Sequence, residues 1–187
     1  ETRPTTDRVK EGLFSALQFD IEGRRVLDLF AGTGALGIEA LSRGARELVA
    51  VESAAPAAAL IAKTLTALKH NRSWEPGMSA RVVKARAEKY AAAASAVAPF
   101  DVIFIDPPYA FETEACNQLL ADLAGRESGE LTGEGTVIVL ERSTRSDEPT
   151  APEGWDITDR RDYGETAVYY IEPAESAEPA EPVESAD

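Results

Sequence analysis

The tetrapeptide Asp106-Pro107-Pro108-Tyr109 joins an acid, a rigid turn and an aromatic ring at the end of the apolar segment 100–106. Successive prolines fix φ and keep the residues before them out of the helical region, so the turn is stiff. The geometry suits activation of an exocyclic amine on a base. Asp106 and the Pro107 carbonyl accept its two N–H protons, and Tyr109 stacks on the ring. Each such charge-assisted hydrogen bond is worth about 1.5–3 kcal/mol, or about ten- to a hundredfold in rate. The alternative is a proline turn carrying a surface acid.

Three glycines form a second motif between a predicted strand and a predicted helix. Gly32, Gly34 and Gly37 fit the pattern G-x-G-x-x-G, and Glu52 ends the next predicted strand, 20 residues after Gly32. This arrangement is typical of a nucleotide site, in which the acid accepts hydrogen bonds from ribose hydroxyls. The alternative is that the glycines only permit a tight turn from strand to helix.

Asp28, four residues before Gly32, helps to choose between two nucleotide ligands. A dinucleotide would place an anionic pyrophosphate against the loop and helix N-terminus, close to this acid. S-adenosylmethionine (SAM) would instead offer its carboxylate to the loop amides and its ammonium to Asp28. A charge pair about 4 Å apart in a partly dry site is worth on the order of a few kcal/mol, which favours SAM. The alternative role for Asp28 is to cap the loop's backbone N–H groups.

Hydrophobic periodicity predicts alternating strands and helices along most of the chain. The predicted elements are helix 7–17, strand 25–30, helix 35–43, strand 47–52, helix 54–70, strand 81–85, helix 87–97, strand 100–106, helix 112–124, strand 135–141 and a hairpin of strands 155–161 and 167–171. In the helix over 54–70, we expect Leu60, Ile61, Leu65 and Leu68 on the apolar side. Five alternations predict an α/β, doubly wound, mostly parallel Rossmann-like sheet with a C-terminal antiparallel hairpin. Ligands bind such sheets beyond the carboxyl ends of the strands.

Composition bounds the possible functions. The 187 residues suffice for one domain and are too few for two of ordinary size. With a single cysteine and a single histidine, no metal site is expected. No apolar run reaches the roughly 18 residues of a membrane helix, and no secretory signal is visible, so a cytoplasmic protein is expected.

The negative charge is concentrated toward the C-terminus. Residues 172–187 contain six acids, no base and three prolines, a composition that predicts a disordered tail. Those six acids account for six of the fourteen net negative charges, so residues 1–171 keep a charge of −8. We therefore predict one catalytic domain over 1–171, including an N-terminal helical element over 1–19. Its acidity gives no general footprint for nucleic acid, so such binding must depend on a local site.

The segments DLFAGTGALGIEALSRGA, DVIFIDPPY and RPTTDRVKEGLF together resemble the bacterial 16S rRNA (guanine(966)-N(2))-methyltransferase family, which belongs to the class I SAM-dependent methyltransferases. The resemblance extends nearly to the acidic tail. It implies a seven-stranded methyltransferase sheet, SAM as the donor and a guanine N2 of small-subunit rRNA as the acceptor, with Asp106–Tyr109 as the catalytic motif. It also implies a set of donor-site residues: Asp28, Phe30, Ala31, Gly32, Thr33, Gly34, Glu52 and, where many relatives carry a polar residue, Ala87.

A weaker set of candidates surrounds the first helix and the catalytic motif. Arg3, Thr5, Thr6 and Arg8 are expected to contact the RNA backbone or line the donor cleft, or to be ordinary helix-start residues, and Phe111 to extend the platform for the base. Arg142 is expected in a solvated loop. The expected partner is 16S rRNA, alone or within a 30S particle, and the expected state is a monomer with no membrane association.

Three alternatives remain open at this point. The first keeps the chemistry with another acceptor, adenine N6 in DNA or a protein glutamine, although amide-modifying enzymes favour Asn at the position of Asp106. The second is an NAD-dependent oxidoreductase, which explains neither Asp28 nor the proline turn. The third is a catalytically inactive nucleotide-binding module that assists ribosome assembly. An unpaired or flipped base is required for the favoured reaction, because a base edge within a duplex is inaccessible.

Overall fold

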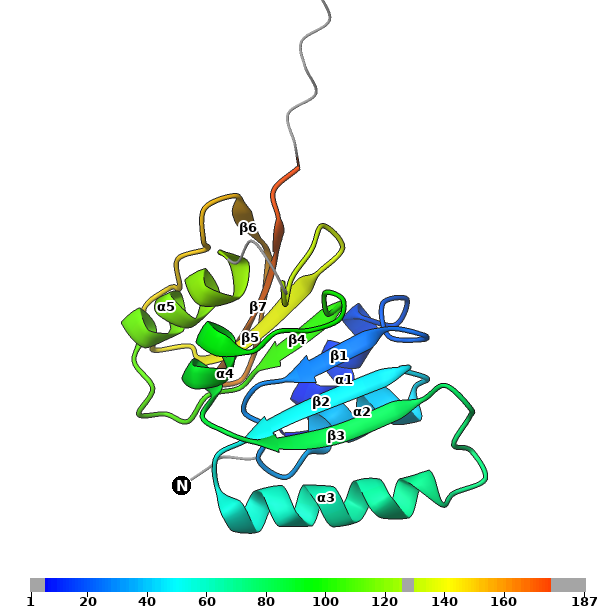
Figure 1. The fold of residues 1–187 in the computed structure, drawn as a ribbon. Helices are drawn as coiled ribbons and strands as arrows, with labels where there is room; N and C mark the ends of the chain where they lie inside the picture. The colour runs from blue at the N-terminus through cyan, green and yellow to red at the C-terminus, as the bar shows by residue number, and fades with distance from the viewer. Residues whose placement is uncertain (1–5, 126–129, 176–187) are drawn as a thin grey trace, which may run out of the picture.

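The computed structural model describes residues 6–125 and 130–175. Its elements follow one another as α1 (Asp7–Ala16), β1 (Arg25–Asp28), α2 (Ala35–Ser42), β2 (Glu47–Glu52), α3 (Ala55–Lys69), β3 (Ser79–Lys84), α4 (Ala87–Ala93), β4 (Val102–Ile105), α5 (Thr113–Ala124), β5 (Val137–Ser143), β6 (Trp155–Tyr163) and β7 (Thr166–Pro173). Figure 1 shows a twisted central sheet with helices on both faces. Every predicted helix and strand is present, with small differences at the ends.

Seven strands form one sheet in the order β3-β2-β1-β4-β5-β7-β6. The first five strands in this order run parallel, whereas β7 runs antiparallel between β5 and β6. The predicted α/β, doubly wound sheet with a C-terminal antiparallel hairpin is thus confirmed. Because the chain order reverses between β1 and β4, the carboxyl ends of these two strands mark the switch point at which such sheets bind ligands.

The sheet separates two apolar cores. Successive strand residues point to opposite faces, so Val26 packs in one core and Leu27 in the other. Helices α1, α2 and α3 cover the first face, and α4 and α5 cover the second (Figure 1). On the first face, the Phe14 ring of α1 lies 5.8 Å from the Phe104 ring of β4, measured between centroids. This alternation also places Asp28, two residues after Val26, on the face covered by α1.

Two helix predictions need correction. Leu60 is 66 % exposed, while Ile61 and Leu65 are buried, so Leu60 does not belong to the apolar side of α3. At about 100° per residue, Leu60 lies a large angle away from the face that Ile61 presents to the sheet. Helix α4 ends at Ala93 rather than near residue 97, because Ala94 adopts extended backbone with φ −69° and ψ 151°.

The C-terminal strand is longer than predicted. β7 continues through Pro173, and Glu172 pairs with Asp156 of β6, so the boundary predicted at residue 171 falls inside a strand. Residues 176–187 of the predicted tail lie outside the described residues. Among the residues that are described, no helix is long and apolar enough to cross a membrane.

Candidate active site

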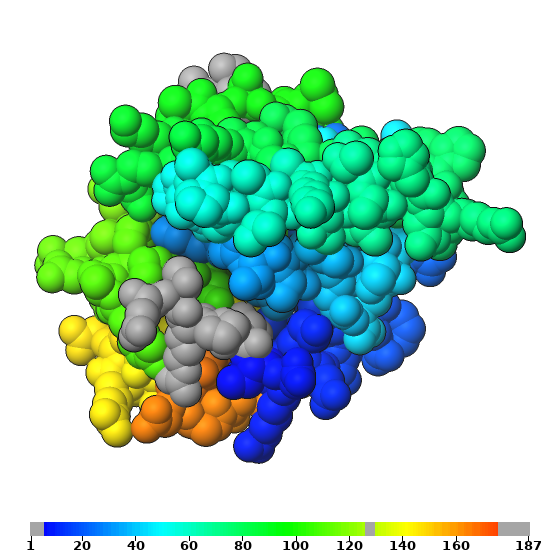
Figure 2. Space-filling view, turned by 90° about the horizontal axis from the view of Figure 1, so that it is seen from below, coloured from blue at the N-terminus to red at the C-terminus, as the bar shows by residue number. Residues whose placement is uncertain are grey.

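A cleft opens at the carboxyl ends of β1, β4 and β5. It is lined by residues of α1, of the loop after β1, of the Asp-Pro-Pro-Tyr turn after β4, of the end of β5 and of the β6–β7 turn. Figure 2 shows these segments gathered on one face of the molecule, with α1 in dark blue, residues near 35 in lighter blue, the turn after β4 in green, and the two later segments in yellow and orange. The two sequence motifs therefore share a site, as the sequence predicted from their positions at strand ends.

The glycine loop shows why each glycine is needed. Gly32 and Gly34 have φ of +56° and +81°, in the left-handed region that side chains disfavour. The Gly34 amide donates to the Ala31 carbonyl at 2.7 Å, which closes the turn into α2. Gly37 has a different role, because a Cβ there would lie 2.7 Å from Cδ1 of the buried Leu48. The third glycine thus lets α2 pack closely against β2.

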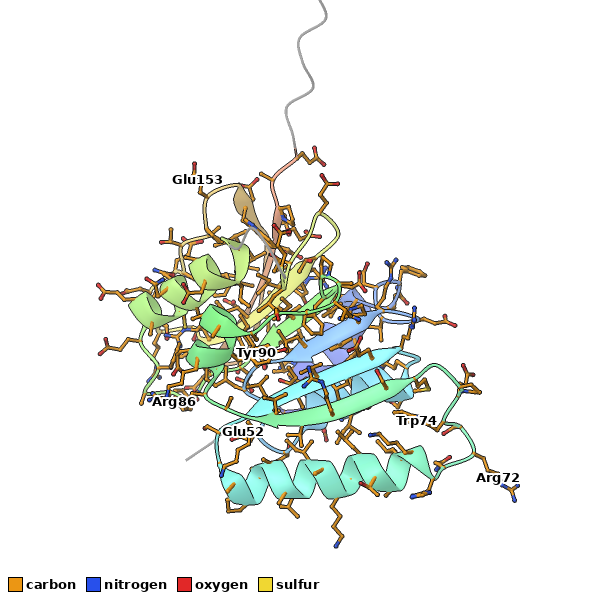
Figure 3. All side chains as sticks on the ribbon, viewed as in Figure 1. Glu52, Arg72, Trp74, Arg86, Tyr90 and Glu153 are labelled. Carbon is orange, nitrogen blue, oxygen red and sulfur yellow. The ribbon has the colours of Figure 1, made fainter. Side chains whose placement is uncertain are left out.

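Glu52 ends β2 and holds the glycine loop in place. Its Oε1 accepts a hydrogen bond from the Gly32 amide at 3.0 Å, and its Oε2 accepts one from the Ala54 amide at 2.8 Å. These bonds fix the carboxylate at the carboxyl edge of the sheet, where Figure 3 labels it near the start of α3. Since a carboxylate oxygen can accept more than one hydrogen bond, both oxygens retain capacity for the hydroxyls of a ribose.

Asp28 is a buried acid inside the cleft. Its exposed fraction is 1 %, and neither carboxylate oxygen has a hydrogen-bond partner among the described residues. Burial raises the pKa of Asp28 to about 7, the negative charges of Asp106 and Glu52 add to that rise, and the nearby Gly37 amide opposes it. A buried carboxylate without a partner is costly, so the site favours a ligand that brings a cation to it.

The Asp-Pro-Pro-Tyr turn is held from behind by an arginine. The Phe111 amide donates to the Pro108 carbonyl at 2.9 Å, and the Phe111 carbonyl accepts from Nη1 of Arg142 at 2.8 Å. The Phe111 ring meets the Phe30 ring edge-on, with centroids 5.3 Å apart. The Asp-Pro-Pro-Tyr turn is therefore connected directly to the glycine loop. Tyr109 lines the cleft and is 61 % exposed.

The sequence prediction missed the contribution of β5. Arg142 was expected in a solvated loop, yet it is 9 % exposed because β5 continues to Ser143 and pairs with β7. Its neighbour Glu141 is 5 % exposed and lines the cleft, as do Ser143 and Ser146. The available signal was the apolar run 137–140, which leads directly into Glu141 as the preceding strand leads into Asp106.

The weaker candidates have mixed positions. Thr6 lines the cleft, and its Oγ1 also accepts a hydrogen bond from the Val9 amide at 3.4 Å as the N-cap of α1. Arg8 is exposed and is not among the residues lining the cleft, and Arg3 and Thr5 lie outside the described residues.

Ala87 is the first residue of α4. It is 4 % exposed and does not line the cleft, although the β3 end that precedes it is bonded to β2 through the Ala85 amide and the Glu52 carbonyl at 3.2 Å. Figure 3 shows Glu52 and the adjoining Arg86 toward the same edge of the sheet. A contact from the backbone of Ala87 to the donor therefore stays a prediction.

Comparison with known proteins agrees with the fold and the motifs. The family described as conserved hypothetical protein 95 matches residues 1–172. The chain belongs to this family. It is 34 % identical over 167 residues to the Ribosomal RNA small subunit methyltransferase D of Escherichia coli (strain K12), which covers 88 % of the chain and 76 % of the relative. The protein of the same name from Haemophilus influenzae is 34 % identical over 164 residues, which cover 87 % of the chain and 78 % of the relative. The family resemblance identified from the sequence is therefore confirmed.

Solved structures give the same assignment of fold. The yhhF protein of Escherichia coli superposes with a TM-score of 0.77 at 29 % identity, covering 91 % of this chain and 88 % of that one. A magnesium protoporphyrin IX methyltransferase from Synechocystis PCC 6803, solved with bound SAM, superposes with a TM-score of 0.64 at 12 % identity, covering 89 % of this chain and 79 % of that one. At that identity it shows the fold alone. The family member described here is a methyltransferase with the α/β fold of that class.

Proposed function

We propose that this methyltransferase transfers the methyl group of SAM to the exocyclic N2 amine of a guanine in 16S rRNA. One observation carries the proposal: the Asp-Pro-Pro-Tyr turn and the buried Asp28 carboxylate line the same cleft as the glycine loop. Relatives that share a third of the sequence are named as methyltransferases of small-subunit ribosomal RNA, which supports the substrate class. With such a substrate, we expect the enzyme to act in the cytoplasm.

The cleft fits SAM better than a dinucleotide. Asp28, buried and without a partner among the described residues, suits the ammonium of the methionine part. The amides of Ala31, Gly32 and Gly34 already donate within the protein, so its carboxylate is assigned to the N-terminal turn of α2, where Ala35 and Leu36 line the cleft. Glu52 suits the ribose hydroxyls. A pyrophosphate in that place would face the carboxylates of Asp28 and Asp106, and the repulsion between like charges in a partly buried cleft disfavours it.

SAM, when bound, supplies a methyl group made electrophilic by an adjacent sulfonium. Asp106 and the Pro107 carbonyl accept hydrogen bonds from the two N–H groups of the amine, which localises the nitrogen lone pair. Tyr109 stacks on the base and keeps the amine in line. As the new C–N bond forms, the bond from the methyl carbon to sulfur would break and its electron pair would return to sulfur as a neutral thioether. The amine loses one proton, which Asp106 accepts and passes to solvent. Two charge-assisted hydrogen bonds and fixed alignment account for most of the acceleration that such a site can supply.

Methyl transfer from labelled SAM tests the proposal. The acceptors are 30S particles, naked 16S rRNA, DNA and bulk protein, and the modified residue is identified after digestion. N2-methylguanine from a ribosomal acceptor is expected, whereas N6-methyladenine or methylglutamine would establish one of the alternative acceptors. Comparing particles with naked RNA also tests whether the substrate is an assembled 30S particle.

Asp106→Ala tests the catalytic role. The variant is expected to lose at least a hundredfold in kcat, because both its hydrogen bond and its proton acceptance are removed. Its affinity for SAM, measured by calorimetry, should stay within a few-fold of the parent value. Turnover at the parent rate would rule out the role assigned to this carboxylate.

A further inference from the structure

We infer that Glu141 determines specificity for guanine by accepting a hydrogen bond from N1–H of the target base. This inference rests on the proposed function and adds a residue that reads the base next to the amine being methylated. Glu141 lies at the end of β5, is 5 % exposed and lines the cleft together with Asp106.

The sheet register places Glu141 beside the catalytic acid. Ile105 of β4 pairs with Leu140 of β5, so Asp106 and Glu141 follow at equivalent positions on two adjacent parallel strands. Neighbouring strands lie about 4.8 Å apart. Val139, two residues before Glu141, packs in the core on the α1 face, as does Phe104, two residues before Asp106. Both acids therefore leave the sheet on the same face.

Two adjacent acceptors match one edge of guanine. The Watson–Crick edge of guanine presents N1–H and the N2 amine as neighbouring donors. With Asp106 at the amine, a carboxylate one strand away is positioned for N1–H. Adenine and other purines without N1–H present a lone pair at N1, which a carboxylate repels. A site that accepts a hydrogen bond from a substrate N–H disfavours an analogue with a lone pair at that position, because two acceptors then face each other.

Burial separates Glu141 from the other glutamate in the cleft. The side chain of Glu165, in the β6–β7 turn, is 62 % exposed and lies 3.4 Å from Nη2 of Arg145. Water can replace any base contact made there, so Glu165 can discriminate little. Glu141 is 5 % exposed, so water competes far less for a base contact at this carboxylate than at Glu165. The same cleft holds Asp28, so three carboxylates line it together with one arginine, Arg142, and this balance disfavours a phosphate there.

The test uses 16S rRNA with a single changed base. The methylated guanine is first mapped with the parent protein, and RNA is then assembled with either guanine or 2-aminopurine at that position. The base 2-aminopurine keeps the N2 amine but has a lone pair at N1. The parent protein is expected to prefer guanine by about a hundredfold or more in kcat/KM. Glu141→Gln should reduce this ratio at least tenfold, because the amide can donate to N1 of 2-aminopurine as well as accept from guanine.

Three controls make the result decisive. Glu153→Gln makes the same chemical change at an exposed residue that does not line the cleft, and it should keep the parent ratio. Calorimetry of SAM binding tests whether the cleft of Glu141→Gln is intact. If this variant binds SAM weakly, Glu141→Ala is used instead, and the ratio of the two kcat/KM values is expected to fall in the same way. The missing O6 of 2-aminopurine affects parent and variant alike, so the comparison isolates Glu141.

The outcomes distinguish the inference from the proposed function. A parent protein that methylates no guanine in any ribosomal acceptor overturns the proposed function. A parent protein that methylates guanine and 2-aminopurine equally well overturns only the role of Glu141. A variant that keeps the parent ratio while binding SAM normally does the same.

Discussion

Replacing Asp28 by Asn is expected to stabilise the protein without SAM, and to do so only toward neutral and higher pH. Burial, the charge of Asp106 and the charge of Glu52 raise the pKa of Asp28 from 3.8 to about 7. Between these two values the folded protein holds a proton that the unfolded chain has lost, so the free energy of unfolding falls as pH rises. The stabilising contribution is complete below pH 3.8 and is lost once the pH passes about 7. This rise of the Asp28 pKa lowers the free energy of unfolding by at most ~4 kcal/mol between pH 3.8 and about 7.

The measurement is urea unfolding of the parent and Asp28→Asn at pH 5.5, 6.5 and 7.5. Groups that do not interact with Asp28 contribute equally to the two proteins, so they cancel in the difference between the two free energies of unfolding. Between pH 5.5 and 7.5, this difference should shift by about 2 kcal/mol in favour of Asn. The slopes of the urea plots should agree, since neither protein changes the surface exposed on unfolding.

SAM binding should show the opposite preference. Only the ionised carboxylate attracts an ammonium, so the affinity of the parent for SAM should rise about tenfold between pH 5.5 and 7. The α-amino group of the ligand stays protonated throughout that window. Asp28→Asn should bind SAM weakly with almost no dependence on pH. A constant stability difference across this range, or a pH-independent affinity of the parent for SAM, would refute the account of Asp28. In that account its pKa is raised in the free protein and its charge is neutralised by the bound ligand.

Two further substitutions test the frame around the cleft. Gly37→Ala places a Cβ 2.7 Å from Cδ1 of the buried Leu48, so it should lower the free energy of unfolding, measured in urea, by about 1–2 kcal/mol. This loss is expected despite the better helix propensity of Ala. Equal or greater stability would show that the Leu48 side chain can move aside without cost. Arg142→Lys removes the paired donation to the Phe111 carbonyl and Thr113, so kcat should fall about tenfold while SAM affinity by calorimetry is retained. A fall in SAM affinity with unchanged kcat would assign Arg142 to the donor site instead.

The sequence predicted the parts of the site that depend on local chemistry. The three glycines, Asp28 and the proline turn are informative because each requires a particular backbone or charge at one position. Their meeting in one cleft followed from a general property of parallel sheets, in which strands end at the same edge. Glu52 was placed correctly at the end of β2, but its bonds to the Gly32 and Ala54 amides were not predicted.

The contribution of β5 required the sheet register. Glu141 ends the predicted strand 135–141, and Arg142 was expected in the solvated loop after it; neither belongs to a turn motif, so their residue types alone give no sign of burial. Pairing with β7 extends β5 to Ser143 and buries both side chains, and this depends on contacts with residues 166–168, far along the chain. Leu60 shows the converse: its residue type suggests burial, while its position on α3 leaves it 66 % exposed.

An enzyme with a net charge of −14 can act on a polyanion if its acidic cleft admits a base of the RNA and keeps the phosphates outside. Asp28, Asp106 and Glu141 would repel phosphate at the point where the reaction occurs. The groups proposed to enter there are a cationic sulfonium ligand and the donor edge of a neutral base, and both are attracted to carboxylates. Phosphates of the RNA must then stay outside the cleft while one base reaches in. A base presented alone, unpaired or turned out of its stack, meets that requirement, and a base in a regular duplex does not.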